Sequence, residues 1–315
     1  QRLLEIPINP EMREFKKANF IKELQSSPIA LSTKLANEQH YEVPPAFFQE
    51  IMGAYLKYSC GWFDNNTTSL DISEENMLSL YIERLDIQNH QQILDLGCGW
   101  GSFTLFAASK FPNSTFVAVS NSNDQIEFIN NTAKARSLKN VKAIKQDMNN
   151  LSLDRSFDRI ISIEMFEHMR NYGALLKELR SHLQNDGKMF VHIFTHKDTS
   201  YHYEIEDEND WMSRYFFTGG QMPSDDLLHY FQQHLTLADH WQVSGTHYEK
   251  TSNAWLSRMD ANKAELFPLI QETYGEHQAL KWWVYWRVFY MACAELWGFD
   301  QGEEWFVSHY LFENK

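Results

Sequence analysis

The central region of the chain alternates short apolar segments with longer amphipathic ones. The apolar segments have the length and composition of buried strands, and they cover residues 93–96, 115–119, 141–145, 157–163 and 188–194. Segments with helical periodicity lie between them, over residues 102–110, 123–136 and 172–183. Strands that alternate with helices form a parallel sheet with helices on both faces, so this pattern predicts an α/β fold.

The flanking regions follow a different order. On the N-terminal side, helices are predicted over 11–25 and 74–85, and Ser73 is the expected N-cap of the second. Pro44 and Pro45 interrupt regular structure between these helices. On the C-terminal side, the predicted elements are helices over 224–233 (N-cap Ser224), 253–272 and 277–297, and strands over 235–243 and 305–312.

Together these patterns predict one α/β unit with additions at one end of its sheet. The expected parts are an N-terminal helical cover (1–72), a Rossmann-like core (73–196) and a C-terminal remainder (197–315). Within the remainder, the core is expected to continue over about 224–245 and 303–313. The segments between, about 197–223 and 246–300, are expected to be insertions that cap a substrate site.

Charge and cysteine content restrict the function classes. The chain has 28 Lys and Arg against 42 Asp and Glu, a net charge of −14 that disfavours nucleic acid and stable association with anionic membranes as partners. A cationic small molecule would instead be attracted. Cys60, Cys98 and Cys293 form neither a disulfide framework nor a metal-ligand pattern, so no metal is expected and the predicted location is the cytoplasm.

A glycine-rich loop follows the first central strand and precedes a helix. Asp95, Gly97, Gly99 and Gly101 are spaced as D-x-G-x-G-x-G. Glycines allow a sharp turn and a close approach of the backbone to a ligand. The spacing differs from the G-x-G-x-x-G of dinucleotide-binding folds. It is similar to motif I of class I S-adenosylmethionine (SAM)-dependent methyltransferases, in which the loop wraps the methionine part of the cofactor.

Longer motifs carry a more specific resemblance. They are 37–44 (NEQHYEVP), 58–63 (YSCGWF), 163–172 (IEMFEHMRNY), 201–204 (YHYE) with 210–211 (DW), 260–262 (DAN), 285–287 (YWR) and 302–305 (GEEW). The chain resembles coclaurine N-methyltransferase-like enzymes of the cyclopropane-fatty-acid synthase superfamily from residue 37 almost to its end. The resemblance implies a Rossmann-like, seven-stranded fold that binds SAM in its core. It also implies methyl transfer to the nitrogen of a small, aromatic, benzylisoquinoline-like amine, with S-adenosylhomocysteine (SAH) as product.

The resemblance also assigns residues to the cofactor. Tyr58 and Ser59 are expected at its carboxylate, and Asn121 and Gln125 at its ribose, where hydroxyl and amide groups take the place of an acid found in many relatives. Asp147 is expected at the adenine amino group. The full expected cofactor set is Tyr58, Ser59, Asp95, Gly97, Gly99, Ser120, Asn121, Gln125, Gln146, Asp147, Met148 and Ile163.

Glu164, Glu167 and His168 are the expected catalytic residues. An alkylamine is mostly protonated at pH 7 and then has no lone pair, so a carboxylate can bind the ammonium and a neighbouring His or Glu can remove its proton. A helix that begins at residues 164–169 would place all three side chains on one face. The alternative is a helix N-terminus whose acids only complement the helix dipole.

Aromatic side chains are expected to surround the cationic substrate. Tyr81, Tyr203 and Trp286 are the candidates, although ordinary packing is the better explanation for most of the ten tryptophans. The long aromatic C-terminal helices could also supply the face of a homodimer.

A second hypothesis within the superfamily is a lipid cyclopropane synthase or methyltransferase. In those enzymes a Cys, a Glu, a His and a Tyr hold bicarbonate, the base, and here Cys60, Glu167, His192 and Tyr248 stand at those places. The negative charge and the lack of a basic amphipathic helix argue against a lipid substrate. A third class, a methyltransferase fold that only binds, is disfavoured by the intact glycine loop and Glu-x-x-Glu-His motif.

Overall fold

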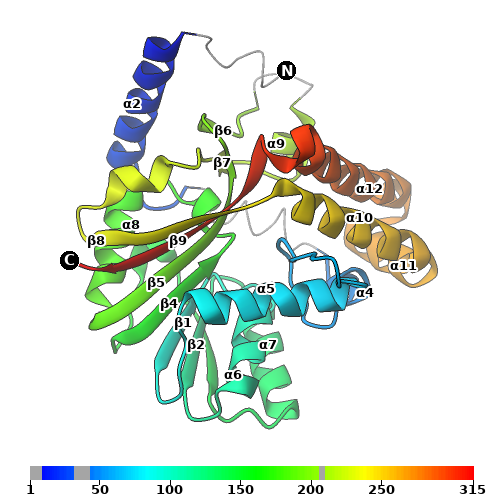
Figure 1. The fold of residues 1–315 in the computed structure, drawn as a ribbon. Helices are drawn as coiled ribbons and strands as arrows, with labels where there is room; N and C mark the ends of the chain where they lie inside the picture. The colour runs from blue at the N-terminus through cyan, green and yellow to red at the C-terminus, as the bar shows by residue number, and fades with distance from the viewer. Residues whose placement is uncertain (1–8, 32–42, 206–209) are drawn as a thin grey trace.

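A seven-stranded sheet forms the centre of the protein (Figure 1). The structure is a computed structural model and describes residues 9–31, 43–205 and 210–315. The strand order is β3-β2-β1-β4-β5-β9-β8, with β9 antiparallel to both of its neighbours and β1 to β5 parallel. The strands are β1 (Gln92–Leu96), β2 (Thr115–Ser120), β3 (Val141–Lys145), β4 (Phe157–Ile163), β5 (Leu183–His196), β8 (Leu235–Val243) and β9 (Trp305–Asn314). The expected seven-stranded Rossmann-like sheet is confirmed.

Helices cover both faces of this sheet because successive residues of its central strands are apolar on both sides. On one face, Ile93, Phe116 and Ile161 pack against α5 (Leu70–Arg84) and α6 (Ser102–Lys110), beside α7 (Asn123–Ala135). On the other face, Leu94, Val117 and Ile160 belong to a second apolar cluster. The elements that contribute to this cluster are α2 (Pro10–Ser26), α8 (Tyr172–Ser181) and the 3₁₀ turn η3 (Leu227–Phe231).

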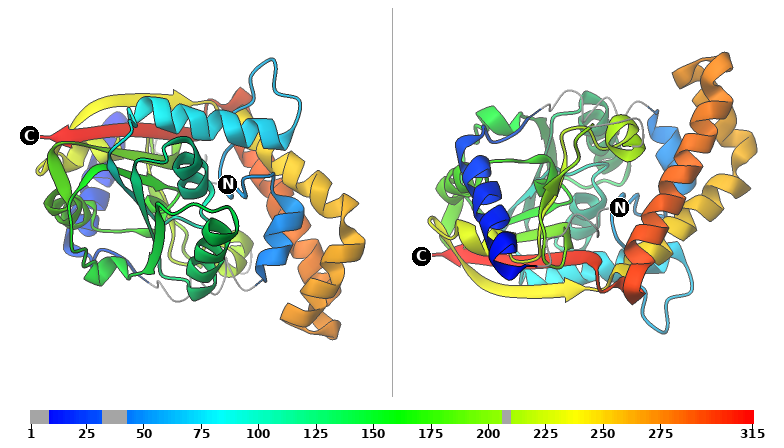
Figure 2. Two further views of the ribbon diagram at one scale, coloured as in Figure 1. Left: turned by 90° about the horizontal axis from the view of Figure 1, so that it is seen from below. Right: turned by 90° about the horizontal axis from the view of Figure 1, so that it is seen from above.

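The C-terminal helices lie to one side of the sheet (Figure 2). They are α10 (Gly245–Ala261), α11 (Lys263–Tyr274) and α12 (Glu276–Gly298), and all three come between β8 and β9 in the chain. They pack on α4 (Pro45–Ile51), which begins at a proline that is tolerated in the first turn of a helix. This helical group therefore connects two neighbouring antiparallel strands of the sheet.

Shorter elements complete the fold. They are the strands β6 (Tyr201–His202) and β7 (Gln221–Met222), the helix α9 (Trp211–Tyr215), and the 3₁₀ turns η1 (Met148–Asn150), η2 (Phe166–His168) and η4 (Phe299–Gly302). In the part of the chain that the structure describes, no helix combines the length and the hydropathy needed to cross a membrane. Residues 37–42 of the first sequence motif lie outside the described residues.

Three expectations about helices outside the site are wrong. The helix expected over 253–272 is two helices, α10 and α11, which meet at Asn262. Ser73 is not an N-cap: α5 begins earlier, Ser69 accepts the Ile72 N–H, and Ser73 donates to the carbonyl of Leu70. The helix expected over 224–233 is only the turn η3, because Ser224 pairs with His196 of β5 in a bridge and so starts this segment in an extended conformation.

The loops after β1 and β4 meet at the carboxyl edge of the sheet, where α/β folds bind ligands. Their close approach depends on Gly97, whose φ of +78° belongs to the left-handed region. A Cβ at this position would lie 2.6 Å from Cγ of Met165, in the loop after β4. Gly99 also has a positive φ, but a Cβ there would meet no atom within 4 Å. The glycine loop therefore packs on the loop after β4 at Gly97, and it leaves free space beside the backbone at Gly99.

Gly97→Ala is expected to destabilise the fold more than Gly99→Ala. Both changes place a Cβ in the left-handed region, at about 1–2 kcal/mol each, and only Gly97→Ala adds the clash with Met165. Urea unfolding should show a larger loss of unfolding free energy for Gly97→Ala, by roughly 1 kcal/mol or more. Equal losses for the two variants would contradict the packing role of Gly97.

Candidate active site

A largely apolar cavity of about 340 Å³ opens beside the carboxyl end of β4. Glu164, Glu167 and His168 supply its acid–base groups. Most of the remaining wall is aromatic: Tyr58, Phe194, Tyr201, Tyr203, Phe217, Tyr248, Trp255, Phe289 and Trp297. A cavity of this size, with few convergent polar groups in an aromatic wall, is typical of a small-molecule site.

The local backbone that brings the three acid–base residues together is not the expected helix. Glu164 has a φ of +47°, and residues 166–168 form the single 3₁₀ turn η2. The helix over 164–169 is therefore a wrong prediction. The left-handed residue turns the chain sharply at the end of β4, and this turn, instead of helical periodicity, directs the three side chains into one cavity.

The Glu164 carboxylate is surrounded by hydrogen-bond donors. Its Oε1 accepts the Cys60 N–H at 3.2 Å and lies 3.1 Å from Nε2 of His192, and its Oε2 accepts the Tyr248 O–H at 2.6 Å. Burial raises the pKa of Glu164 to about 7, against the opposing effects of the Lys57 ammonium and these hydrogen bonds. Donors that converge on a buried carboxylate stabilise its ionised form.

Glu167 lies in a different environment. Its side chain is buried, and its Oε2 has no hydrogen-bond partner among the described residues. Burial, reinforced by the charge of Glu164, raises the pKa of Glu167 well above its ordinary value. When two carboxyl groups share a site, the one without donors keeps the proton. Glu164 is therefore the anion of the pair and Glu167 the neutral acid at neutral pH.

His168 is the third acid–base group of the cavity. Its ring stacks on Phe217 with centroids 5.4 Å apart, and burial lowers the pKa of His168 to about 4. The imidazole is therefore neutral at pH 7, and a neutral imidazole has one nitrogen that can accept a proton.

The residues proposed to hold bicarbonate surround a carboxylate of the chain itself. The Cys60 backbone, the His192 ring and the Tyr248 hydroxyl all contact Glu164. The Cys60 thiol is buried and donates to the carbonyl of Gly61, and Cys60 and His192 do not line the cavity. A glutamate already occupies the position in which these donors would bind an external anion.

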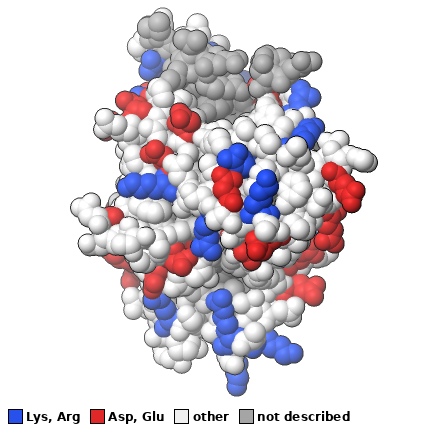
Figure 3. Space-filling view, turned by 90° about the vertical axis from the view of Figure 1, so that its right-hand side faces the viewer, with Lys and Arg blue, Asp and Glu red and all other residues white. Residues whose placement is uncertain are grey.

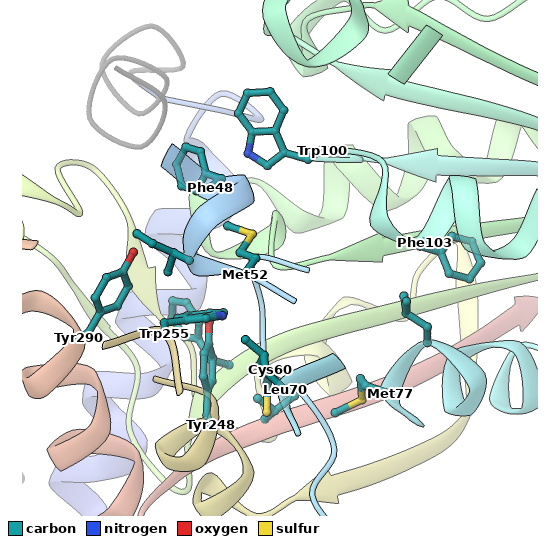
Figure 4. Close-up of a cluster of buried hydrophobic side chains, with 14 of the residues drawn as sticks. Phe48, Met52, Cys60, Leu70, Met77, Trp100, Phe103, Tyr248, Trp255 and Tyr290 are labelled. Atoms are coloured by element: carbon teal, nitrogen blue, oxygen red, sulfur yellow. The ribbon is translucent and has the colours of Figure 1, made fainter. Parts of the chain in front are cut away.

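The aromatic candidates divide into two groups. Tyr203 and Tyr248 line the cavity, whereas Tyr81 and Trp286 are buried away from it. Tyr81 is bonded to His192, and Trp286 packs on Phe47 with ring centroids 4.9 Å apart. Tyr81 and Trp286 belong to a large cluster of buried apolar side chains. Figure 4 shows part of this cluster, in which Tyr248 and Trp255 of α10 lie near Cys60. A large apolar ring gains most by full burial, so the sequence pattern alone could not separate core aromatics from cavity aromatics.

A second, narrower pocket lies against the glycine loop. Its volume is about 60 Å³, and its lining includes Ser59, Asp95, Gly97, Gly99 and Ile163. Tyr58 and Glu164 line both this pocket and the larger cavity, so the two spaces adjoin. A group held on the glycine loop would therefore face the acid–base residues directly.

The other expected cofactor residues follow along the same edge of the sheet. The ends of β2 and β3 are held together where Gln146 N–H donates to the carbonyl of Ser120. The Ser120 hydroxyl donates to Oε1 of Gln125 at 2.6 Å, whereas Nε2 of Gln125 is buried without a partner among the described residues. Asp147 caps η1 by accepting the Asn149 N–H. Asn121 and Met148 are partly exposed on the same two loops.

The sequence analysis did not identify four residues that hold site residues in place through hydrogen bonds. Lys57 is 2% exposed and donates to the carbonyl of Cys60 at 2.7 Å. Glu74 accepts the backbone N–H groups of Gly53 and Tyr55 and so holds the loop that carries Tyr58. Arg84 and His309 reach the site through His192. Lys57 stands next to the Tyr58 motif, but no local pattern marks the other three.

A family model described as mycolic acid cyclopropane synthetase matches residues 31–300. The chain belongs to this family. A curated (S)-coclaurine N-methyltransferase from Thalictrum flavum subsp. glaucum is 40% identical over 94% of this chain and 83% of that protein. A second curated (S)-coclaurine N-methyltransferase, from Papaver somniferum, is 37% identical over 94% of this chain and 86% of its own length.

A solved structure of this group has the same fold. It is a coclaurine N-methyltransferase bound to N-methylheliamine and SAH, 37% identical, with a TM-score of 0.96 over 99% of this chain and 91% of that one. The resemblance to coclaurine N-methyltransferase-like enzymes is therefore confirmed, and the class I methyltransferase fold with it. The chain thus combines this fold with a cavity that contains Glu164, Glu167 and His168.

Tyr248→Phe is expected to raise the pKa of Glu164, because it removes a donor that favours the charged carboxylate. The ¹³C carboxyl shift of Glu164, followed over a pH titration of the protein labelled at glutamate, measures this pKa. Tyr290→Phe is the matched control, since the Tyr290 hydroxyl is buried without a partner among the described residues. Equal titrations in the two variants would show that Tyr248 does not stabilise the charge.

Proposed function

We propose that the chain is a SAM-dependent N-methyltransferase that acts on a small, cationic, aromatic amine and releases SAH. The observation that carries this proposal is the lone Oε2 of Glu167, buried in an aromatic cavity that adjoins the glycine-loop pocket. The names of the relatives, (S)-coclaurine N-methyltransferases, and of the solved complex with N-methylheliamine and SAH support the same reaction.

The residues on the glycine side fit SAM. The space above Gly99 accommodates the close approach of a ligand to the backbone, and Nε2 of Gln125 is a buried donor that a ribose hydroxyl would satisfy. Tyr58 and Ser59 would hold the methionine end, and Asp147 would hold the adenine. SAM, when bound there, supplies an electrophilic methyl group that needs no acid activation.

The residues on the other side prepare the amine. An ammonium beside Glu167 supplies the hydrogen bond that Oε2 lacks among the described residues, and its positive charge lowers the pKa of that carboxyl, so that amine binding releases the Glu167 proton to solvent. The ionised Glu164 attracts the cation, and the aromatic wall binds its ring. Glu167 or His168 then accepts the ammonium proton and leaves the nitrogen lone pair free to attack. The wall also positions this nitrogen in line with the methyl group.

The lipid alternative is disfavoured. Its bicarbonate would need the donors that Glu164 already occupies. Acidic and basic side chains are interspersed with uncharged surface on the face in Figure 3. Methyl transfer from SAM labelled at the methyl group decides between the two: we expect label in one or more members of a panel of benzylisoquinoline-type amines. Label only in unsaturated phospholipid, with bicarbonate added, would contradict the proposal.

Glu167→Gln is expected to lower kcat by roughly 10²–10⁴-fold, the range for loss of a general base. SAH affinity, measured by isothermal titration, should stay unchanged because Gln retains the size and neutrality of the protonated carboxyl. The amide also keeps the fold intact for the same reason. Loss of SAH binding in a folded variant, or full activity, would show that the role assigned to Glu167 is wrong.

We further propose that the chain is cytoplasmic and forms a homodimer. The free state of Cys60, Cys98 and Cys293 supports a reducing compartment. The dimer proposal rests on an exposed stripe of α12. The stripe consists of Lys281, Val284, Val288, Met291 and Glu295, at the 3–4 spacing of a helix-pairing seam. In an antiparallel pair centred on Val288, Val284 lies opposite Met291 of a second copy and the lysine end meets the glutamate end.

Val284→Glu is expected to produce a monomer, because it places a charge among the apolar residues of this stripe. Sedimentation velocity at micromolar concentration measures the mass. Ile72→Glu is the matched control, since Ile72 is similarly exposed on α5 (39% against 42% for Val284) but lies outside the stripe. A dimer that survives Val284→Glu, or a monomeric parent protein, would exclude this interface.

A further inference from the structure

We propose that Arg84 and Lys57 are positioning residues that set the tautomer of His192, so that its Nε2–H always points to Glu164. The inference deepens the proposed function and rests on it, because it assigns the control of the Glu164 charge to residues that act through His192. It rests on two chains of hydrogen bonds, each of which starts at a cation and ends at Nδ1 of His192.

The first chain crosses the antiparallel pair β5 and β9. His192 and His309 are directly opposite in the register of these strands. Arg84 contacts Nδ1 of His309, and Nε2 of His309 lies 2.8 Å from Nδ1 of His192. A guanidinium can only donate, so Nδ1 of His309 must accept and, in the neutral ring, the proton is on Nε2. His309 therefore donates to Nδ1 of His192.

The second chain reaches the same atom from the N-terminal loop. The Lys57 ammonium donates to the Ser59 hydroxyl. Burial raises the pKa of Tyr81, and Ser59 opposes this rise as a hydrogen-bond donor to the phenol would. The Tyr81 hydroxyl lies 2.9 Å from Nδ1 of His192. Because an ammonium has no acceptor, the protons along this chain are also directed away from the cation. Both chains present donors to Nδ1 of His192, so this nitrogen is an acceptor and carries no proton.

The consequence appears at the opposite nitrogen of the ring. With Nδ1 accepting, a neutral His192 carries its proton on Nε2, 3.1 Å from Oε1 of Glu164. His192 and His309 are fully buried, and burial together with the Arg84 and Lys57 charges lowers both pKa values well below the ordinary range. Both rings are therefore neutral, and each has one tautomer that satisfies all of its neighbours.

This tautomer matters for the charge of Glu164. If His192 carried its proton on Nδ1, Nε2 would face Glu164 as a second acceptor, and the carboxyl would have to be protonated to avoid the clash. The groups that face Glu164 or these histidines, from every element packed on them, are Lys57, Cys60, Tyr81, Arg84, Glu167, His168, His240, Tyr248 and Cys293. Among the donors to Glu164, only His192 has two tautomers, so it is the one whose orientation other residues must set.

Nitrogen-15 NMR of the protein labelled at histidine measures the tautomers directly, without any substrate. We expect the wild-type protein to show His192 and His309 neutral and protonated on Nε2 at pH 7. Arg84→Met with Tyr81→Phe removes the cation that fixes the His309 tautomer and the donor that ends the second chain, and should give His192 a substantial Nδ1–H population. Arg84→Lys in the wild-type background retains a cationic donor and is the conservative control, expected to preserve the wild-type tautomers.

The same variants should move the titration of Glu164. Loss of one donor to a charged group raises its pKa, so the ¹³C titration midpoint and the acid limb of the kcat/KM profile are expected to shift upward by about one pH unit in the double variant. Activity is lost as the pH falls through this pKa, because Glu164 then loses its charge.

The outcomes separate cleanly. Wild-type His192 protonated on Nδ1, or charged at pH 7, overturns the inference even if the double variant does not fold. Unchanged tautomers and an unchanged Glu164 midpoint in a folded double variant overturn it as well. A protein that methylates no amine, yet shows the expected tautomers and midpoint shift, would contradict the proposed function and leave this inference standing.

Discussion

The structure depends on keeping a negative charge on Glu164, whose side chain is only 10% exposed. A buried carboxylate is unstable unless donors and opposite charges replace its water, and here the Cys60 backbone, the Tyr248 hydroxyl, the His192 ring and the Lys57 ammonium do so. These four groups come from three separate parts of the chain, so the charge can exist only when the N-terminal loop, β5 and α10 are all in place. The acid–base site is in this sense a product of the whole fold.

The two carboxyl groups differ because their surroundings differ. Glu164 receives donors on both oxygens, whereas Glu167, three residues later, has an oxygen that no described residue contacts as a donor. The same residue type therefore provides the more readily ionised carboxyl, which attracts a cation, and a neutral acid that ionises when the cation arrives. The aromatic wall excludes water and so strengthens both effects.

Sheet topology explains why a cofactor pocket and an amine cavity adjoin. β1 and β4 are neighbours, so the glycine loop and the Glu164 turn emerge side by side. Gly97 allows the two loops to touch, and Tyr58 and Glu164 form the boundary between the two spaces. The helices α10 and α12 close the cavity from the side, with Tyr248, Trp255 and Phe289 in its wall.

The sequence by itself determined the alternating strands and helices, the glycine loop after β1 and the motif that carries Glu164, Glu167 and His168. These features depend on local periodicity and on backbone requirements of a few neighbouring residues. Only the tertiary structure decided that Glu164 lies in a left-handed turn, that Trp286 is core, and that Cys60, His192 and Tyr248 surround a glutamate. Burial and hydrogen bonding join residues that are far apart in the chain, such as Arg84 and His309, and no local pattern encodes such a contact.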